Sequence, residues 1–226
     1  MATKKTAQSK PQPRRIYIVD DHPLFREGLA SIIRQRRDLC VCGEADEAGK
    51  AFGEISRMRP DILVTDIGLR GKSGLELLRD LQAYRPELPV LVISMHDETL
   101  YAERVLKAGG RGYIMKQEGP EKILQAITKV LAGQIYLSEK MSAGILERIA
   151  SPAARAKTSP IGKLTDREFE ILRLIGDGKD GHQIAKDLRL SIKTVSCHRA
   201  HMKQKLGLKS ATALVHFASR WVGEES

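Results

Sequence analysis

The chain has 226 residues and a formal net charge of +10, a length sufficient for one large or two small domains with cores of their own. No apolar run approaches the roughly 18 residues that a membrane span needs, and no apolar segment long enough for a signal peptide follows the basic residues at the start. The three cysteines are too few and too scattered for a disulfide framework or a zinc site. We therefore expect a cytoplasmic protein without membrane partners.

Charge is distributed unevenly along the chain. Residues 1–15 carry five basic and no acidic side chains, and residues 16–150 carry 19 basic and 20 acidic ones. Residues 151–226 carry 14 basic and eight acidic side chains. A near-neutral middle and a basic C-terminal part predict two domains with different partners, and the basic part is the candidate for binding nucleic acid.

Five short apolar runs alternate with five amphipathic segments in the first part of the chain. The runs predict strands at residues 16–19, 39–41, 62–65, 90–94 and 112–116. The amphipathic segments predict helices at residues 23–33, 48–58, 74–84, 99–108 and 121–131. This alternation predicts an α/β fold, a doubly wound five-stranded parallel sheet.

Polar side chains lie at the carboxyl ends of four of these strands. Asp20 and Asp21 follow the first strand, Asp66 follows the third, Ser94 ends the fourth and Lys116 ends the fifth. Because the ends of parallel strands meet at one edge of a sheet, these groups can converge. Three carboxylates require a cation, and oxygen ligands favour Mg²⁺. With a lysine and a hydroxyl beside them, they suit phosphoryl transfer to a carboxylate, although an Asp after a strand can also simply form a turn.

These residues resemble the receiver domain of bacterial two-component response regulators over roughly residues 15–135. The resemblance implies a flavodoxin-like fold, with Asp66 as the phosphoacceptor, Ser94 as the switch hydroxyl, Tyr113 as the switch aromatic and Lys116 as the invariant lysine. In the switch so implied, phosphate on Asp66 draws Ser94 towards it, Tyr113 fills the vacated space, and the helix at residues 99–108 presents a changed surface. A half-buried tyrosine can also serve packing alone.

The same resemblance implies a set of Mg²⁺ ligands. Asp21 and Asp66 would coordinate the ion directly, Gly68 through its carbonyl oxygen and Asp20 through water. The family usually has a proline four residues after the phosphoacceptor, where this chain has Arg70. This departure concerns the geometry of the loop rather than the chemistry of the site.

Residues 134–150 carry apolar side chains at helical spacing and predict a connecting helix. Residues 151–160 lack such spacing and contain two prolines, so they predict a flexible tether. The predicted organisation is a disordered basic tail (1–14), a receiver domain (15–135), a connecting helix with a flexible linker (136–160) and a small all-α domain (161–226).

Capping signals predict four helices in the last part of the chain. Two capping boxes open the first two helices: Thr165 with Glu168, and Asp180 with Gln183. Ser191 caps the third helix and Gly207 ends it, while the fourth spans residues 211–221. Two helices joined by a short turn in a small basic domain predict a helix-turn-helix.

The third of these helices carries no carboxylate between residues 191 and 208. Solvated helical faces normally mix charge signs, so this face predicts contact with DNA, with small residues near base edges and basic ones near phosphates. The candidate contacts are Lys193, Thr194, Ser196, Cys197, His198, Ala200, His201 and Lys205.

Residues 164–217 resemble the LuxR-type domain of the NarL/FixJ response regulators. Four segments carry the resemblance: LT-x-RE at 164–168, IA at 184–185, KTV-x-x-H at 193–198 and KLG at 205–207. It implies that the helix from Lys193 to Lys205 lies in the major groove. The chain departs from the family at residues 180–183, where a Ser-Asn-x-Glu-like run is usual, and at Ser196 and Ala200, which are shorter than the lysines of some members.

The two resemblances together predict a two-component transcription regulator that is not an enzyme. A sensor histidine kinase would phosphorylate Asp66, phosphorylation would favour a homodimer, and the dimer would bind paired half-sites in double-stranded DNA. Two alternatives stay open at this point. One is a DNA-binding protein whose receiver is a constitutive dimerisation module; the other is a metal-dependent phosphohydrolase that uses the same aspartate as its nucleophile.

Overall fold

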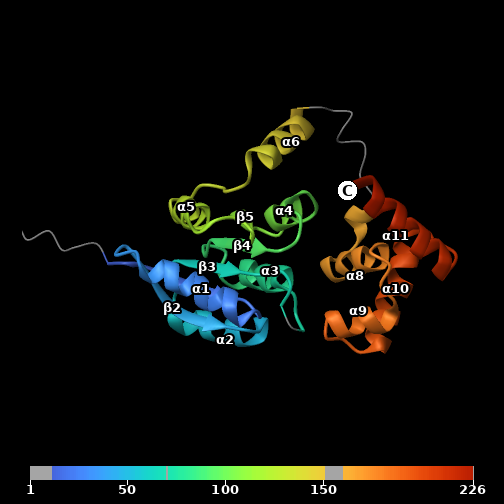
Figure 1. The fold of residues 1–226 in the computed structure, drawn as a ribbon, viewed down its shortest axis with the longest axis horizontal. Helices are drawn as coiled ribbons and strands as arrows, with labels where there is room; N and C mark the ends of the chain where they lie inside the picture. Colours follow the sequence, from blue (N-terminus) through green and yellow to red (C-terminus); the bar gives the residue numbers. More distant parts are fainter. Residues whose placement is uncertain (1–11, 70, 151–159, 226) are drawn as a thin grey trace, which may run out of the picture.

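The structure, a computed structural model, describes residues 12–69, 71–150 and 160–225 (Figure 1). It contains an N-terminal α/β domain and a C-terminal helical domain. The predictions for the tail before residue 12, for Arg70 and for the tether at residues 151–159 lie outside the described residues. Within the described ranges, no helix is both long and apolar enough to cross a bilayer.

Five parallel strands form the sheet in the order β2-β1-β3-β4-β5. They are β1 (Arg14–Val19), β2 (Leu39–Ala45), β3 (Ile62–Thr65), β4 (Val90–Ser94) and β5 (Gly112–Met115). This confirms the predicted fold class. β1 and β2 are longer than predicted. Main-chain pairing continues beyond the apolar runs, for example at Arg14, which pairs with Leu39 although its own side chain is exposed.

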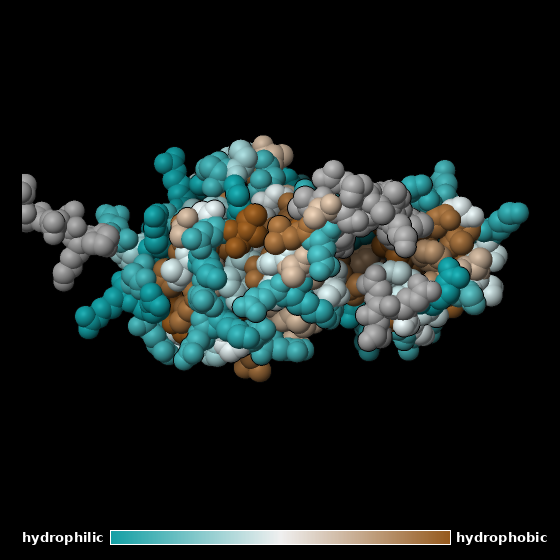
Figure 2. Space-filling model, turned by 90° about the horizontal axis from the view of Figure 1, so that it is seen from above, coloured by the Kyte–Doolittle hydropathy of each residue, from teal (hydrophilic) through white to brown (hydrophobic). Residues whose placement is uncertain are grey.

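Helices cover both faces of the sheet. Alternate residues of a strand point to opposite faces, so each face has its own core. Ile16 and Ile18 of β1 pack with α1 (Pro23–Arg34) and α5 (Pro120–Leu131). Tyr17 and Val19 pack on the other face, with α2 (Ala48–Met58), α3 (Gly74–Tyr84) and α4 (Glu98–Lys107). Hydrophilic residues cover most of the face seen in Figure 2, with apolar residues gathered in smaller patches.

The connecting helix α6 (Glu139–Ala150) begins later than the predicted residue 134. Tyr136 instead continues the sheet beside β5, where its carbonyl accepts from Tyr113 N at 2.9 Å and its N–H donates to Arg111 O at 3.0 Å. Ser138 Oγ then accepts from Met141 N at 3.1 Å, which satisfies an N–H in the first turn of α6. The apolar residues that predicted one helix over residues 134–150 therefore belong to an extended segment at Tyr136 and to a helix that begins at Glu139.

The C-terminal domain consists of η1 (Pro160–Lys163), α8 (Asp166–Gly176), α9 (Gly181–Asp187), α10 (Ile192–Leu206) and α11 (Ala211–Glu225). Both predicted capping boxes are present, at Thr165 and at Asp180. Ser191 caps α10, and Gly207 ends it with a φ of 68°, a left-handed conformation that suits glycine. The helices and turns of the predicted helix-turn-helix are thus confirmed.

The two domains contact each other through α8 and the side of the sheet that carries α3 and α4 (Figure 1). Tyr101 of α4 and Phe169 of α8 meet edge to face, with ring centroids 5.1 Å apart. The Arg104 guanidinium lies 4.0 Å from the Phe169 ring centroid and donates to Ile161 O (2.8 Å) and to Leu164 O (3.1 Å). One arginine of the N-terminal domain therefore satisfies two carbonyls at the start of the C-terminal domain.

A buried carboxylate extends this contact. Asp166 at the start of α8 is 1% exposed and pairs with Arg104 at 3.2 Å and with Arg79 of α3 at 3.0 Å. Nearby, Arg167 donates to Gly71 O at 3.0 Å and to Glu170 at 2.6 Å. Charge-assisted bonds of this kind are strong when they are shielded from water. These bonds could not be predicted from the sequence, because periodicity within each domain does not report how two domains meet.

Candidate functional site

The predicted acidic cluster forms at the carboxyl edge of the sheet. Main-chain bonds hold each residue there: Asp20 N donates to Ala45 O, Asp66 N to Val19 O and Lys116 N to Ser94 O, at 2.8 to 3.0 Å. Lys116 Nζ lies 2.7 Å from Asp66 Oδ2 and 2.7 Å from Asp20 Oδ2, and all three side chains are buried. Residues from three separate strand ends therefore meet at one ammonium group.

Burial disfavours the charged forms of the carboxylates in this cluster. Burial, and next the negative charge of Asp66, raise the pKa of Asp20, while the Lys116 ammonium opposes the rise. Ile67 N donates to Asp66 Oδ1 at 2.7 Å and fixes the orientation of the carboxylate. At Gly74 the chain passes very close to the main chain of Asp66: an added Cβ would lie 1.8 Å from the Asp66 carbonyl oxygen, so only glycine fits.

The donor set fits a hard divalent cation. Ligand atoms of Asp20, Asp21, His22 and Asp66 all lie within 4.8 Å of one another. Gly68 lies beside them, since a Cβ there would be 3.8 Å from Asp66 Oδ2. Three carboxylates face the buried Lys116 and, 4.0 Å from Asp21, the Arg189 guanidinium, which leaves negative charge that a divalent ion can neutralise. The cluster includes His22, which was not among the predicted ligands, although its position directly after the acidic pair was a usable signal.

The two predicted switch residues lie on neighbouring strands, Ser94 at the end of β4 and Tyr113 within β5, opposite Val92. Ser94 and Tyr113 are both fully buried, and the Ser94 hydroxyl accepts from His96 N at 3.3 Å. Tyr113 Oη donates to His96 O at 2.6 Å, and burial raises the pKa of this phenol well above its usual range. Tyr113 thus points inward and is tied to the loop that follows Ser94.

His96 is a third residue at this position, and it reaches the other domain. Its ring stacks on Tyr101 with centroids 4.9 Å apart, and Nδ1 lies 2.5 Å from Arg173 Nη1 of α8. Burial, and next the positive charge of Arg173, lower the pKa of His96 to about 4. Sequence reasoning missed His96, and its place two residues after Ser94 was the only available signal.

The predicted DNA-contacting face of α10 is largely open to solvent. Val195 and Met202 are buried against the domain core, which orients the helix. On the opposite side the exposed candidates are Lys193, Ser196, Cys197, Ala200, His201 and Lys205, while Thr194 and His198 are half-buried. The docked arrangement of the two domains therefore leaves these six candidates exposed.

Lys205 and Thr194 also have partners that support the fold of the C-terminal domain. Lys205 Nζ lies 2.6 Å from Glu168 Oε2, a carboxylate that is 2% exposed. Thr194 supports the N-terminus of α10, since its N–H donates to Ser191 Oγ at 3.0 Å. The Thr194 hydroxyl also lies 2.7 Å from Ser191 Oγ, so both side chains have partners within the domain, and their contact with DNA stays a prediction.

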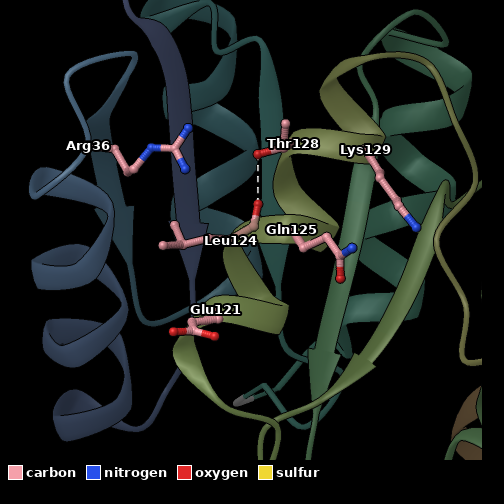
Figure 3. Close-up of a pocket in the computed structure, with 6 residues that line it drawn as sticks. All are labelled: Arg36, Glu121, Leu124, Gln125, Thr128 and Lys129. Carbon is pink, nitrogen blue, oxygen red and sulfur yellow. Dashed lines mark hydrogen bonds between the residues drawn. The ribbon is translucent and has the colours of Figure 1, made fainter.

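A shallow depression of about 340 Å³ lies away from both sites, between α1 and α5 (Figure 3). Its walls come mainly from one face of α5, whose turn is closed by Thr128 Oγ1 donating to Leu124 O at 2.8 Å, together with Arg36 beyond the end of α1. None of the predicted site residues lines it. The depression is therefore separate from the candidate functional sites.

Comparison with known families identifies both halves of the chain. The family model described as the response regulator receiver domain matches residues 16–128. The family model described as bacterial regulatory proteins of the luxR family matches residues 162–218. The oxygen regulatory protein NreC of Staphylococcus aureus (strain JH9) is 34% identical over 208 residues, which cover 90% of this chain and 96% of NreC.

Solved structures give the same result. A LuxR-family two-component response regulator from Aurantimonas sp. SI85-9A1 is 34% identical with a TM-score of 0.58, and it covers 62% of this chain and 100% of its own. The RcsB response regulator of Salmonella typhimurium is 26% identical with a TM-score of 0.62, over 92% of this chain and 98% of its own. A structure of two RcsB dimers bound to two parallel DNAs is also 26% identical, with a TM-score of 0.57 over the same shares.

Proposed function

Because this chain belongs to the two-component response regulators of the NarL/FixJ type, which join a receiver domain to a LuxR-type DNA-binding domain, we propose that Asp66 accepts a phosphoryl group that controls how the chain binds DNA. The observation that carries the proposal is the buried ammonium of Lys116, which lies 2.7 Å from both Asp20 and Asp66 beside Ser94 at the sheet edge. The phosphoryl donor is a sensor histidine kinase.

The residues at the sheet edge have separate tasks in this transfer. Asp66 is the nucleophile: a new O–P bond forms on its carboxylate while the P–N bond of the kinase phosphohistidine breaks, and the leaving imidazole takes up a proton. Lys116 stabilises the negative charge on the transferred oxygens, and Ser94 offers a hydroxyl to them. Asp21, Asp66 and Gly68, with Asp20 through water, would hold Mg²⁺, which would neutralise the negative charge of the incoming phosphate.

The contacts between the domains provide a route by which phosphorylation of Asp66 affects the C-terminal domain. Ser94 and Tyr113 both hydrogen-bond to His96, and His96 contacts Arg173 of α8. A shift of Ser94 towards the phosphate moves this loop and loosens the contact with α8. Most of the candidate DNA-contacting face of α10 is already exposed in the docked state. Undocking therefore does not uncover this face; it changes where α10 can lie relative to the α10 of a second copy.

The DNA-binding unit is a homodimer in this proposal. Two copies of α10 on paired half-sites gain affinity because the second contact becomes intramolecular, an effect of roughly 10²–10⁴. The dimers of RcsB on DNA are a relative's precedent for such an arrangement. Since its target is chromosomal DNA, we place the protein in the cytoplasm.

The test is phosphorylation of the purified full chain by acetyl phosphate with Mg²⁺, followed by intact mass and peptide mapping. The expected product carries one phosphoryl group on Asp66, and Asp66→Asn takes none. Asp80→Asn on the exposed surface of α3 is the matched control and is phosphorylated like the wild type. Phosphate uptake elsewhere, or none at all, would overturn the proposal. Promoter binding that is identical in the wild type and Asp66→Asn under phosphodonor would favour the constitutive dimerisation module instead.

A further inference from the structure

His22 stands at the entrance of the acidic site, between β1 and the first residue of α1. Its main-chain N–H donates to Asp20 Oδ1 at 2.8 Å, and Pro23 begins the helix directly after it. A residue before proline is restricted to extended conformations, as His22 is here, and this restriction and the hydrogen bond together fix the main chain of His22 beside Asp20. The side chain is 64% exposed, so the ring approaches the site from the solvent side, opposite the buried Lys116.

The imidazole nitrogen lies within the space of one coordination shell. His22 Nδ1 is 2.9 Å from Asp21 Oδ1, 3.3 Å from Asp20 Oδ1 and 3.9 Å from Asp66 Oδ2. In an octahedral shell with bonds near 2.1 Å, neighbouring ligand atoms are about 3.0 Å apart and opposite ones about 4.2 Å apart. All three observed distances fall close to or inside this range. A single ion can therefore meet the nitrogen and the carboxylates with small side-chain movements.

A nitrogen ligand changes which ion a carboxylate site prefers. Mg²⁺ is a hard ion that keeps its waters, whereas imidazole suits first-row transition ions. On Mg²⁺ the position facing His22 would stay with water. On a transition ion the imidazole can replace that water and add a bond.

We propose that His22 is a nitrogen ligand of the receiver cation site, so that the site prefers a first-row transition ion such as Mn²⁺ to Mg²⁺. This inference rests on the cation site of the proposed function and adds a ligand and a selectivity to it. The competing role for His22 is a hydrogen bond from Nδ1–H to Asp21 alone, which would give no bond to the ion.

Electron spin echo spectroscopy of Mn²⁺ bound to the full chain distinguishes the two roles. The expected spectrum shows modulation from a directly bound imidazole nitrogen in the wild type and loses it in His22→Ala and in His22→Gln. His216→Ala, which removes an exposed histidine of α11, is the matched control and keeps the modulation. Wild-type protein that binds Mn²⁺ without nitrogen modulation would overturn the inference.

Competition between the two ions gives the second readout. The ratio of the Mg²⁺ and Mn²⁺ dissociation constants should fall about tenfold in His22→Ala, because only the Mn²⁺ complex loses a protein ligand. An unchanged ratio in a variant with wild-type thermal unfolding would contradict the proposal. Phosphorylation of Asp66 with Mg²⁺ is measured separately. Nitrogen coordination without phosphate uptake would keep this inference and overturn the proposed function, and the reverse result would do the opposite.

Discussion

The phosphoryl site and the DNA-contacting face are assembled in opposite ways. Asp20, Asp66 and Lys116 come from the ends of three strands and are almost entirely buried. The face of α10 comes from 15 consecutive residues and is mostly exposed. A buried site made by long-range convergence fails as a unit when one member is removed, because the others lose their partner. An exposed helical face loses its contacts one at a time, so its changes are graded.

Lys116→Met should give the largest effect and breaks the buried site as a unit. It leaves the carboxylates of Asp20 and Asp66 without their shared cation, at a cost of about 3 kcal/mol of unfolding free energy. The pKa of Asp20 is already raised, and a raised carboxyl pKa makes the folded state lose stability as pH rises. Urea unfolding should therefore show a larger loss at pH 8 than at pH 5.

The matched control is Lys122→Met, which removes an exposed lysine paired with Glu118 on the same domain. Its unfolding free energy should stay close to that of the wild type, because an ion pair exposed to water contributes little to stability. Equal losses in the two variants would show that the strand-end site is not a cooperative unit.

The contrast between the sites also explains what the sequence could predict. Apolar runs and capping residues carry local signals, so the strands, the helix-turn-helix and the residues at the strand ends all followed from patterns. The extended segment at Tyr136 did not, because its bonds to β5 are main-chain bonds to a distant strand. The docking of Arg104 against Phe169 and Asp166 was equally hidden, since no local pattern records a contact between two domains.

Arg104→Ala should give the second largest effect, on the link between the two regions. It removes bonds to Ile161 O, Leu164 O and Asp166 across the interface, a loss of about 2 kcal/mol or roughly a 30-fold shift towards undocked domains. Small-angle scattering should detect a larger radius of gyration. Lys107→Ala on the same helix, whose partner Glu103 is also on α4, should leave the radius unchanged. A compact Arg104→Ala protein would show that this contact does not hold the domains together.

Acid should weaken the same link through His96. Its pKa is about 4 when docked against its ordinary 6.5, so undocked protein binds the proton more readily as pH falls from 6.5 towards 4. We expect the ratio of docked to undocked protein to fall about tenfold at pH 5.5. The charged groups that act on His96 are Arg173, Asp66, Lys116 and Asp177.

His96→Asn provides the control for this pH dependence. Glu170, whose pKa burial raises to about 7, contributes the opposite slope, but it is present in both proteins and cancels in their difference. Scattering measured from pH 7 to pH 5 should therefore show a difference between wild type and variant that grows as pH falls. Parallel curves would remove His96 from the link.

The smallest expected effects are on DNA affinity, from substitutions on the exposed face of α10. They test whether this face loses its contacts one at a time. Lys193→Ala should weaken binding to all DNA sequences about threefold and reduce the slope of log affinity against log salt by about one, because an exposed lysine meets phosphate. Ser196→Ala should instead change which sequence is preferred. Lys205→Ala should affect unfolding as well, since it removes the partner of Glu168. Identical behaviour of the Lys193 and Ser196 variants would contradict the division of roles along the helix.

The central claim is that a phosphoryl group at the buried acidic site changes how the distant helix is presented. Light scattering of the full chain with and without beryllofluoride and Mg²⁺, a mimic of the acyl phosphate, tests it most directly. We expect the mass to double when the mimic is added to the wild type and to stay that of a monomer for Asp66→Asn. A mass that does not change in the wild type, or that doubles in both proteins, would contradict it.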